Sequence, residues 1–469
     1  MDQSNRLQLH NLPSSSQIDM KRYRSKGYLH FDKRIKMEHV YQKIQDQNWV
    51  AGHAFLPFIH YKIKLNKYMV KPDVTSKDLR LCKDQKFFKF KKPKERMIYY
   101  ASHLDSYIYK YYGERLNDAY NEYAKQKGID EIAIAYRNNK SGENNIDFAK
   151  EVFKFILQQD NAVIIALDFT KFFDTINHKV LKENIKTVLG VDKLPLDFYK
   201  VFKSITNFSY IDKAAIDEYL ISKYGEKQLK KLKKQGTLKR IMNPSEFREF
   251  KKYRIETHEE DYGIPQGSGM SAVCSNVHLI KFDASLKKWA ESKSALYRRY
   301  CDDLIIVIPF VKDNKTSVNA LVDEVYEIIK EYDDLKVQEE KTEIRIYENG
   351  RIKTLENKLD KIDYLGFLLD GETIKIREKS VFKYYSRAYR KAMISRKKTK
   401  VRGIKTYRWK LYKLYTHLGY DYKGYGNFIS YAQEAHEKMI ELPVRILIKN
   451  QVRKHWSKIQ GKLRKGCSV

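Results

Sequence analysis

Two adjacent aspartates, Asp302 and Asp303, stand between two short runs of strand-forming residues within Leu296–Ile308. Both runs are rich in apolar or aromatic residues, which predicts the two strands of a hairpin with the aspartates at its turn. Such a turn presents two carboxylates at one edge of a sheet. Oxygen ligands of this kind suit Mg²⁺, which is usually held by one or two carboxylates together with substrate phosphates. An ordinary solvated Asp-Asp turn is the alternative.

A third aspartate follows another apolar run. Residues 162–167 are typical of a buried strand, which ends at Asp168, and a helix is expected to start around Thr175–His178. An aspartate at the end of a strand could share a metal ion with the hairpin pair, and the carbonyl of Phe169 could add a ligand. A turn or helix-capping aspartate is the alternative for any single residue of this type.

A glycine-rich loop precedes the hairpin. Gly263–Met270 contains one proline and three glycines, and a helix is predicted from Ser271. Glycines such as Gly267 allow another backbone or a base to approach closely, and Gln266 can hydrogen-bond to a nucleic-acid edge. An ordinary surface turn is the alternative, but the order of loop, helix and hairpin favours a nucleotide-binding role.

Basic residues are mixed with aromatic ones between Phe87 and Tyr100. The pattern predicts a two-stranded ribbon with a charged face. Lys94 and Arg96 on this ribbon could grip a triphosphate, Arg96 through the planar donor fork of its guanidinium. A solvated sheet edge with protective lysines is the alternative. Residues 101–125 have the apolar spacing of a helix.

The net charge of +33, with a pI near 9.6, points to a polyanionic partner. From Arg377 to Val469 the chain has 25 lysines and arginines against five acidic residues, so its last fifth holds most of the excess. Nucleic acid is favoured over a membrane surface, because the basic residues are interleaved with aromatic residues that can stack on bases.

The four cysteines, Cys82, Cys274, Cys301 and Cys467, form no Cys-x-x-Cys pair, and no histidine lies at zinc-ligand spacing from them. A zinc site and a disulfide framework are therefore disfavoured, and a reducing cytoplasm is the expected location. The N-terminus lacks the apolar core of a signal peptide, and the longest apolar runs, such as Leu304–Val311, are too short to span a bilayer.

In order, the chain carries a basic ribbon, a strand ending in aspartate, a Pro-Gln-Gly loop, a Tyr-x-Asp-Asp hairpin, a lysine segment and a Tyr-Leu-Gly-Phe turn. This order resembles the reverse transcriptases over about residues 85–370. The resemblance implies an α+β right-hand polymerase fold with fingers, a palm whose antiparallel sheet is flanked by helices, and an α-helical thumb. We expect an N-terminal extension over residues 1–45, fingers over 46–160, a palm over 161–370 with a basic insertion near 223–254, and a basic thumb over 371–469.

The resemblance also implies a two-metal site. Asp168 and Asp302 would be the bridging ligands and Asp303 would complete the site, with Phe169 adding its carbonyl oxygen. The expected cofactor is a pair of Mg²⁺ ions, with Mn²⁺ as an alternative.

Three further motifs match roles known in that family. Lys341 matches the lysine that neutralises pyrophosphate. Phe173 stands five residues after Asp168, where the family has the steric gate that crowds a ribose 2′-OH and selects deoxynucleotides. The primer grip is matched by Tyr364, Leu365, Gly366 and Phe367.

The implied activity is RNA-directed DNA synthesis, with RNA, a DNA primer or product, and deoxynucleoside triphosphates as partners; a protein partner or a second copy of the chain is a further candidate. The segments Lys26–Asp32, Arg96–Asp105 and Gly267–Asn276 look most like the bacterial defence-associated and abortive-infection reverse transcriptases. Such an enzyme would use a dedicated non-coding RNA, work without an external template, or prime from a tyrosine hydroxyl. A retron- or mobile-element-type enzyme and an inactive nucleic-acid-binding relative are the alternatives.

Overall fold

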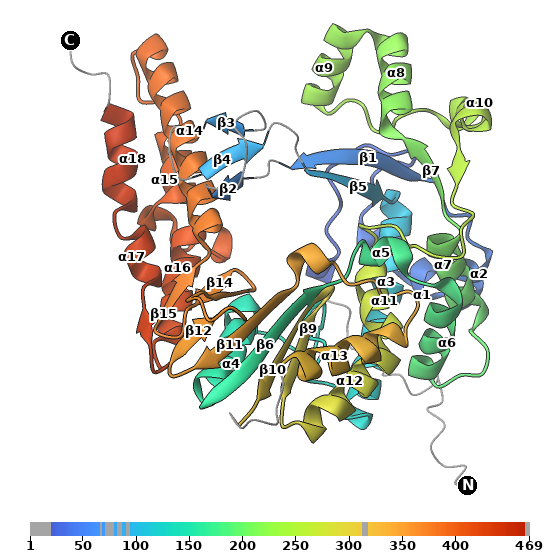
Figure 1. Ribbon diagram of the computed structural model, residues 1–469. Helices are drawn as coiled ribbons and strands as arrows, with labels where there is room; N and C mark the ends of the chain where they lie inside the picture. Colours follow the sequence, from blue (N-terminus) through green and yellow to red (C-terminus); the bar gives the residue numbers. More distant parts are fainter. Residues whose placement is uncertain are drawn as a thin grey trace.

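The computed structural model describes residues 20–65, 68–70, 79–81, 87–90, 94–311 and 318–464. The first 19 residues of the predicted N-terminal extension therefore lie outside the described part. At the centre is a five-stranded antiparallel sheet in the order β12–β11–β6–β10–β9 (Figure 1). Its strands are β6 (Asn161–Asp168), β9 (Leu296–Tyr300), β10 (Asp303–Pro309), β11 (Glu343–Glu348) and β12 (Arg351–Lys353). The two strands predicted for the hairpin and the strand ending at Asp168 are thus confirmed.

Two of the three inner strands, β6 and β10, are buried on both faces, and each face belongs to a different hydrophobic core. Because side chains alternate along a strand, neighbouring residues enter opposite cores. One core takes Val163, Ile165, Leu167, Leu304, Ile306 and Ile308. The other takes Ala162, Ile164, Ile305 and Val307.

Helices cover both faces. The first core includes residues of α3 (His103–Gln126), α6 (His178–Leu189), α11 (Ser271–His278), α12 (Ile280–Ser292) and α13 (Val318–Lys330). The helices predicted over 101–125, near 175–178 and from Ser271 are therefore confirmed as α3, α6 and α11. Asn177 caps the first turn of α6 by accepting a hydrogen bond from the Val180 N–H at 3.0 Å.

The second core joins the central sheet to the C-terminal part of the chain. It contains residues of α4 (Asn145–Leu157), α14 (Glu378–Arg402), α16 (Phe428–Met439) and α17 (Ile448–Val452). It also contains the small sheet β13 (Ile362–Tyr364), β14 (Phe367–Leu369), β15 (Thr373–Ile376) and β16 (Arg445–Ile446). The C-terminal region is completed by α15 (Arg408–Tyr415) and α18 (His455–Arg464), so the prediction that it is mainly helical is confirmed.

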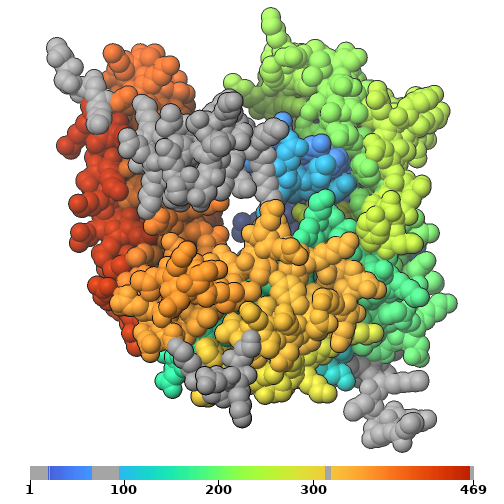
Figure 2. All heavy atoms as spheres, in the orientation of Figure 1, coloured from blue at the N-terminus to red at the C-terminus, as the bar shows by residue number. Residues whose placement is uncertain are grey.

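A second large sheet, in the order β5–β1–β7–β8, lies above the central one in Figure 1. Its strands are β1 (Phe58–Leu65), β5 (Lys94–Tyr100), β7 (Ser209–Asp212) and β8 (Glu256–Thr257). The space-filling view shows a hollow at the centre of this face, with the orange surface of the central-sheet region on one side and the blue surface of the β1–β5 region on another (Figure 2).

The prediction of a single two-stranded ribbon over residues 87–100 is wrong. Phe87–Phe90 forms β4, which pairs with β2 (Tyr68–Val70) and β3 (Leu79–Leu81) in a separate sheet. Residues 94–100 instead pair with β1 along their whole length. Pro93, which has no N–H to donate to a strand partner, separates the two runs, and β1 offers β5 a longer partner than β4 could.

The basic insertion consists of α8 (Lys213–Tyr224), α9 (Glu226–Gln235) and α10 (Pro244–Arg254), which connect β7 to β8. It therefore begins N-terminal to the predicted position near residue 223. Figure 1 shows α8 and α9 above the second sheet, on the side away from β6 and β10. Within the described residues, no helix is both long and apolar enough to cross a membrane.

Candidate active site

The three predicted catalytic carboxylates lie where β6 ends and β10 begins. Asp168 is the last residue of β6 and Asp303 the first of β10, and the two are direct partners across the antiparallel pair. Asp302 is in the turn before β10, and its carbonyl accepts a hydrogen bond from the Phe169 N–H at 3.2 Å. The apolar strands fix the backbone beneath these residues, so the carboxylates are held at one end of a rigid sheet.

The carboxylates repel one another. The pKa of the Asp303 carboxyl is raised to about 6. Burial of the carboxyl is the largest cause, and the charges of Asp302 and Asp168 add to it, although part of the residue's surface is exposed. Burial and the charge of Asp168 also raise the pKa of Asp302. Lys341, in the 3₁₀ helix Glu339–Lys341, pairs its ammonium with the Asp168 carboxylate and partly offsets this repulsion.

These residues fit a divalent cation by their chemistry. Carboxylate oxygens are the ligands that Mg²⁺ prefers. A cation also lowers the repulsion between clustered carboxylates, and in this structure the Lys341 ammonium has that effect. In this conformation, the described residues include no group of three or more His, Cys, Asp or Glu side chains arranged to hold a metal ion. The two-metal site therefore stays a prediction.

A buried ion pair between Arg299 and Asp283 supports the hairpin that carries Asp302 and Asp303, and this pair was not predicted from the sequence. Arg299 and Asp283 are both fully buried, and two nitrogens of Arg299 donate to the two carboxylate oxygens at 2.9 and 2.6 Å. Arg299 also donates to the Cys301 carbonyl at 3.0 Å, directly before Asp302. Tyr297 donates to Asp283 at 2.8 Å. The only sequence signal for this site is an arginine placed between strand-forming residues.

The turn itself is strained at Cys301, whose φ of 62° is in the left-handed region. Its side chain is buried, with Sγ 3.9 Å from the Ser275 Oγ, and burial raises the pKa of the thiol to about 12. The bond from Arg299 to the Cys301 carbonyl and the bond from the Phe169 N–H to the Asp302 carbonyl keep the turn in this conformation. The sulfur is therefore an un-ionised packing group rather than a nucleophile.

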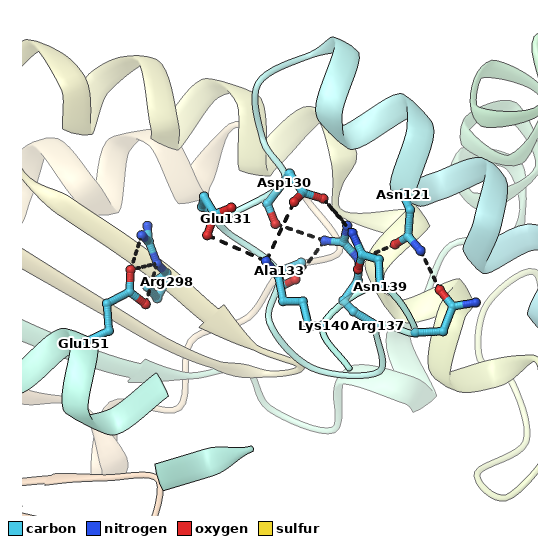
Figure 3. A network of polar contacts seen from close by, with 10 residues as sticks. Asn121, Asp130, Glu131, Ala133, Arg137, Asn139, Lys140, Glu151 and Arg298 are labelled. Carbon is cyan, nitrogen blue, oxygen red and sulfur yellow. Dashed lines mark hydrogen bonds and ion pairs between the residues drawn. The ribbon is translucent and has the colours of Figure 1, made fainter. Parts of the chain in front are cut away.

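A loop between α3 and α4 borders the same turn. The Ile134 N–H of this loop donates to the Arg299 carbonyl at 3.0 Å, and the backbone N–H of Arg299 donates to the Ile132 carbonyl at 2.8 Å. Figure 3 shows how buried Arg137 holds the loop through Asn121, Asp130 and the Ala133 carbonyl.

This loop places Tyr136 beside the hairpin turn. Tyr136 has a φ of 60° and is 47% exposed. Partial burial first, and then the neighbouring Cys301 thiol and Asp302 carboxylate, raise the pKa of its phenol. Sequence reasoning did not identify this residue, because nothing in its local pattern distinguishes it from a core tyrosine.

The predicted gate residue, Phe173, is half-buried in the short helix α5 (Phe172–Thr175), five residues after Asp168. Its carbonyl accepts the Ile264 N–H at 2.9 Å, and the Gly263 N–H donates to Ile176 at 2.8 Å. The glycine-rich loop is thus bonded directly to residues 173–176, called the gate segment here because they include the predicted gate residue.

The same loop is also bonded to β5. The Gln266 carbonyl accepts the Tyr99 N–H at 3.1 Å. Gly267 has a φ of +122°, and a Cβ there would lie 2.6 Å from the Tyr99 carbonyl oxygen, so no other residue fits without a shift. Arg96 is exposed on this strand, while the side chain of Lys94 lies outside the described part. The structure therefore links the predicted nucleotide-binding segments through backbone contacts.

The predicted primer-grip residues form the turn between β13 and β14. Tyr364 and Phe367 are buried in the second core, so only the backbone and side chain around Leu365 and Gly366 reach the surface. Leu365 has a φ of 46° and Gly366 one of 97°. Arg377, which sequence reasoning missed, donates its N–H to the Gly366 carbonyl at 2.8 Å.

Arg377 also connects this turn to the carboxylates. Its Nε lies 2.7 Å from the Asp363 Oδ1. The charge of Arg377 acts to lower the pKa of Asp303, although burial and the charge of Asp302 raise that pKa by more. The β13–β14 turn and the aspartate hairpin are therefore neighbours. Whether the turn contacts a primer stays a prediction.

Comparison with protein families matches residues 88–369 to the family described as reverse transcriptase (RNA-dependent DNA polymerase). Comparison with curated proteins gave no match. Among solved structures, apo telomerase from Candida tropicalis, truncated from its C-terminal domain, is 13% identical with a TM-score of 0.38, covering 72% of this chain and 59% of that one. Telomerase from Candida albicans, in complex with a fragment of telomeric RNA, is 10% identical with a TM-score of 0.37, covering 90% and 58%. This chain thus spans less than two thirds of either telomerase chain.

Proposed function

This chain belongs to the reverse transcriptase family and has its right-hand polymerase fold, and we propose that it is an RNA-directed DNA polymerase. The observation that carries the proposal is the pairing of Asp168 with Asp303 across strands β6 and β10, with Asp302 in the adjoining turn. Nucleotidyl transfer needs carboxylates at one point of a rigid scaffold, and the sheet supplies that arrangement.

Asp168, Asp302 and Asp303, with the Phe169 carbonyl, would hold two Mg²⁺ ions, or Mn²⁺ in their place. Bound there, such ions activate the primer hydroxyl and neutralise the triphosphate and its leaving group. Lys341, now paired with Asp168, would turn its ammonium toward the departing pyrophosphate. The exchange of one anionic partner for another needs only rotation of an exposed lysine side chain.

The incoming deoxynucleotide would lie between the gate segment and β5. Phe173 would limit the space at the 2′ position, Gln266 and Gly267 would line the base or template side, and Lys94 and Arg96 would contact the triphosphate. The backbone bonds from the loop to Phe173 and Tyr99 support this proposal, because they couple the three segments.

Primer extension by the purified full chain tests the activity. With a DNA primer on an RNA template, deoxynucleotides and Mg²⁺ or Mn²⁺, we expect DNA products that copy the template. Reactions without a template distinguish untemplated synthesis, and DNA that stays attached to the protein after denaturation reveals priming from a tyrosine hydroxyl. Absence of incorporation under all these conditions would favour an inactive nucleic-acid-binding relative.

Replacing Phe173 by alanine is expected to admit ribonucleotides. Removing the ring frees the space that a 2′-OH would occupy, so the ratio of ribonucleotide to deoxynucleotide incorporation should rise by about tenfold or more. Phe172→Ala is a poor control because that ring is buried. Tyr199→Ala, an exposed aromatic on α7 (Leu196–Thr206), is the better one. If the ratio is unchanged in Phe173→Ala, the gate lies elsewhere.

We further propose a role in bacterial antiviral defence, with a structured RNA as partner. The likeness of Lys26–Asp32, Arg96–Asp105 and Gly267–Asn276 to defence-associated enzymes supports the role, and the charge of +33 supports an RNA partner. Expression with the native flanking DNA should protect bacteria from phage, and the Asp302→Ala chain should not. Full protection by Asp302→Ala would remove the catalytic basis of this role; a retron or intron locus around the gene would favour the mobile-element alternative.

A further inference from the structure

A cavity of about 610 Å³ lies on the outer side of the second sheet, away from the catalytic carboxylates. Its walls come from the N-terminal segment 27–34, from Tyr100 at the end of β5, from α8, and from residues 233–241 after and within α9. None of the residues predicted for catalysis or primer contact lines it. Figure 1 shows α8 and α9 above β1 and β5, and shows below them β6 and β10, the strands that carry Asp168 and Asp303, so this cavity and those two strands are on opposite sides of the sheet.

The walls of the cavity are held by specific contacts. The Ile241 N–H donates to the His30 carbonyl at 2.9 Å, and the Tyr28 hydroxyl donates to the Ala101 carbonyl at 2.8 Å. A separate small hydrophobic core lies beneath, with Phe31, Ile59, Ile211, Ile216, Leu220, Leu229, Ile241 and Met242. The N-terminal segment, which has no other explained role, is therefore fixed in place as one wall.

The rim of the cavity is strongly cationic. Five basic residues line it, namely Lys33, Arg34, Lys213, Lys233 and Lys239, against one carboxylate, that of Asp217. Asp217 pairs with Lys213 and lies 3.8 Å from the Lys233 ammonium. Lys33 and Lys239 are exposed and make no ion pair with any described residue. The rim thus has cationic charge left over for an anionic ligand.

The floor is apolar and aromatic. Ile216 and Leu220 are nearly fully buried, and the half-buried rings of Tyr28 and Tyr100 lie 4.6 Å apart between centroids. A ligand that fills the cavity should therefore have a flat apolar part and a multiply charged anionic part. The volume lies in the range of about 300–1,000 Å³ that is usual for small-molecule sites.

We propose that this cavity is a second nucleotide-binding site, which holds one base against the tyrosines and aliphatic side chains and its phosphates at Lys33 and Lys239. The nucleotide comes either from a free nucleoside triphosphate or from a unit of a single strand. The site goes beyond the polymerase function, because it lies across the sheet from the carboxylates and needs none of them. Charge-assisted bonds to phosphate and stacking on aromatic rings are the interactions that would select this ligand.

The test uses the full chain with Asp302→Ala and Asp303→Ala, in the presence of EDTA, so that binding at the carboxylates is suppressed. The probes are 8-azido-ATP and a single-stranded hexanucleotide carrying one 4-thiouridine. Lys33→Glu with Lys239→Glu should weaken binding of the accepted probe by about tenfold or more, because two phosphate contacts become repulsive. The matched control is Lys227→Glu with Lys234→Glu, two exposed lysines of α9 outside the cavity, which should change it by less than about twofold.

Photo-cross-linking identifies the site directly. A cross-link in the peptide containing Tyr28 or Tyr100, lost in the Lys33 and Lys239 variant, supports the proposal. Cross-linking by 8-azido-ATP assigns a free nucleotide, and cross-linking by the hexanucleotide alone assigns a unit of a strand. Equal effects of the two lysine pairs, or no cross-link near the cavity with either probe, would overturn the proposal. Matching far-UV circular dichroism of the variants verifies that both fold. Because the palm carboxylates are already replaced, failure here leaves the polymerase proposal untouched.

Discussion

Replacement of Asp302 by alanine is expected to lower deoxynucleotide incorporation on the order of a thousandfold or more. Metal ions at the proposed site would contribute several kcal/mol of charge stabilisation to the transition state, and each 1.4 kcal/mol is about tenfold in rate. Asp168→Ala and Asp303→Ala should have effects of the same order, because the three carboxylates would act together at the proposed site. The measurement is the initial rate of primer extension at saturating deoxynucleotide.

The fold should survive this replacement. The Asp302 side chain lies beside like-charged carboxylates and forms no ion pair with any described residue, and the hydrogen bond lost with it is that of the buried Cys301 thiol, a weak donor. The unfolding temperature of Asp302→Ala should therefore match that of the unchanged chain. Asp192→Ala, at an exposed position, is the control for rate and stability. An Asp302→Ala protein that polymerises at the original rate would contradict the proposed site.

Replacement of Asp283 by asparagine is expected to cost about 3–5 kcal/mol in the free energy of unfolding, because it leaves the charge of Arg299 buried without its partner. Both side chains are 0% exposed. The hairpin should lose order first, since Arg299 also holds the Cys301 carbonyl. Urea denaturation measures the stability, and hydrogen exchange of the β9 and β10 amides measures the local effect.

Arg298 provides a matched control on the neighbouring position of the same strand. It points to the other face and pairs with Glu151, whose side chain is 40% exposed (Figure 3). Arg298→Met should cost only about 0–1 kcal/mol, as expected for a partly exposed pair. Arg299→Met combined with Asp283→Leu should recover much of the stability lost in Asp283→Asn, because no unpaired charge remains. Equal costs at Arg298 and Asp283 would show that the buried pair does not support the hairpin.

The central strands and the site carboxylates could be predicted from sequence because their signals are local. An apolar run that ends at Asp168 and a second that starts after Asp303 are readable without knowing their partners. The register that sets these two residues opposite each other is a long-range property, and only the structure gives it. The prediction of a ribbon over residues 87–100 was wrong for the same reason. The strand that pairs with β5 is β1, some thirty residues earlier in the chain, rather than the neighbouring run Phe87–Phe90.

The supporting residues were less predictable. Arg299 and Arg377 look like any other basic residues in a chain with 92 lysines and arginines, and their partners Asp283 and Asp363 are not marked by periodicity. Gly267 was predicted to allow the close approach of another backbone or a base, and the structure shows that its neighbour is a backbone, that of Tyr99, which the sequence could not identify. Contacts between segments that meet only in the fold account for most of what was missed.

The sharing of β6 and β10 between two cores limits how the chain can be dissected. Separate expression of the part up to β15 and the part after it should not yield two folded fragments. The first would expose the face that carries Ala162, Ile164, Ile305 and Val307, and the second would lose the strands against which α16 and α17 pack. Truncation or split-protein experiments on the basic C-terminal helices would therefore disturb the carboxylates as well, and charge-reversing point substitutions on exposed lysines are the way to separate nucleic-acid affinity from catalysis.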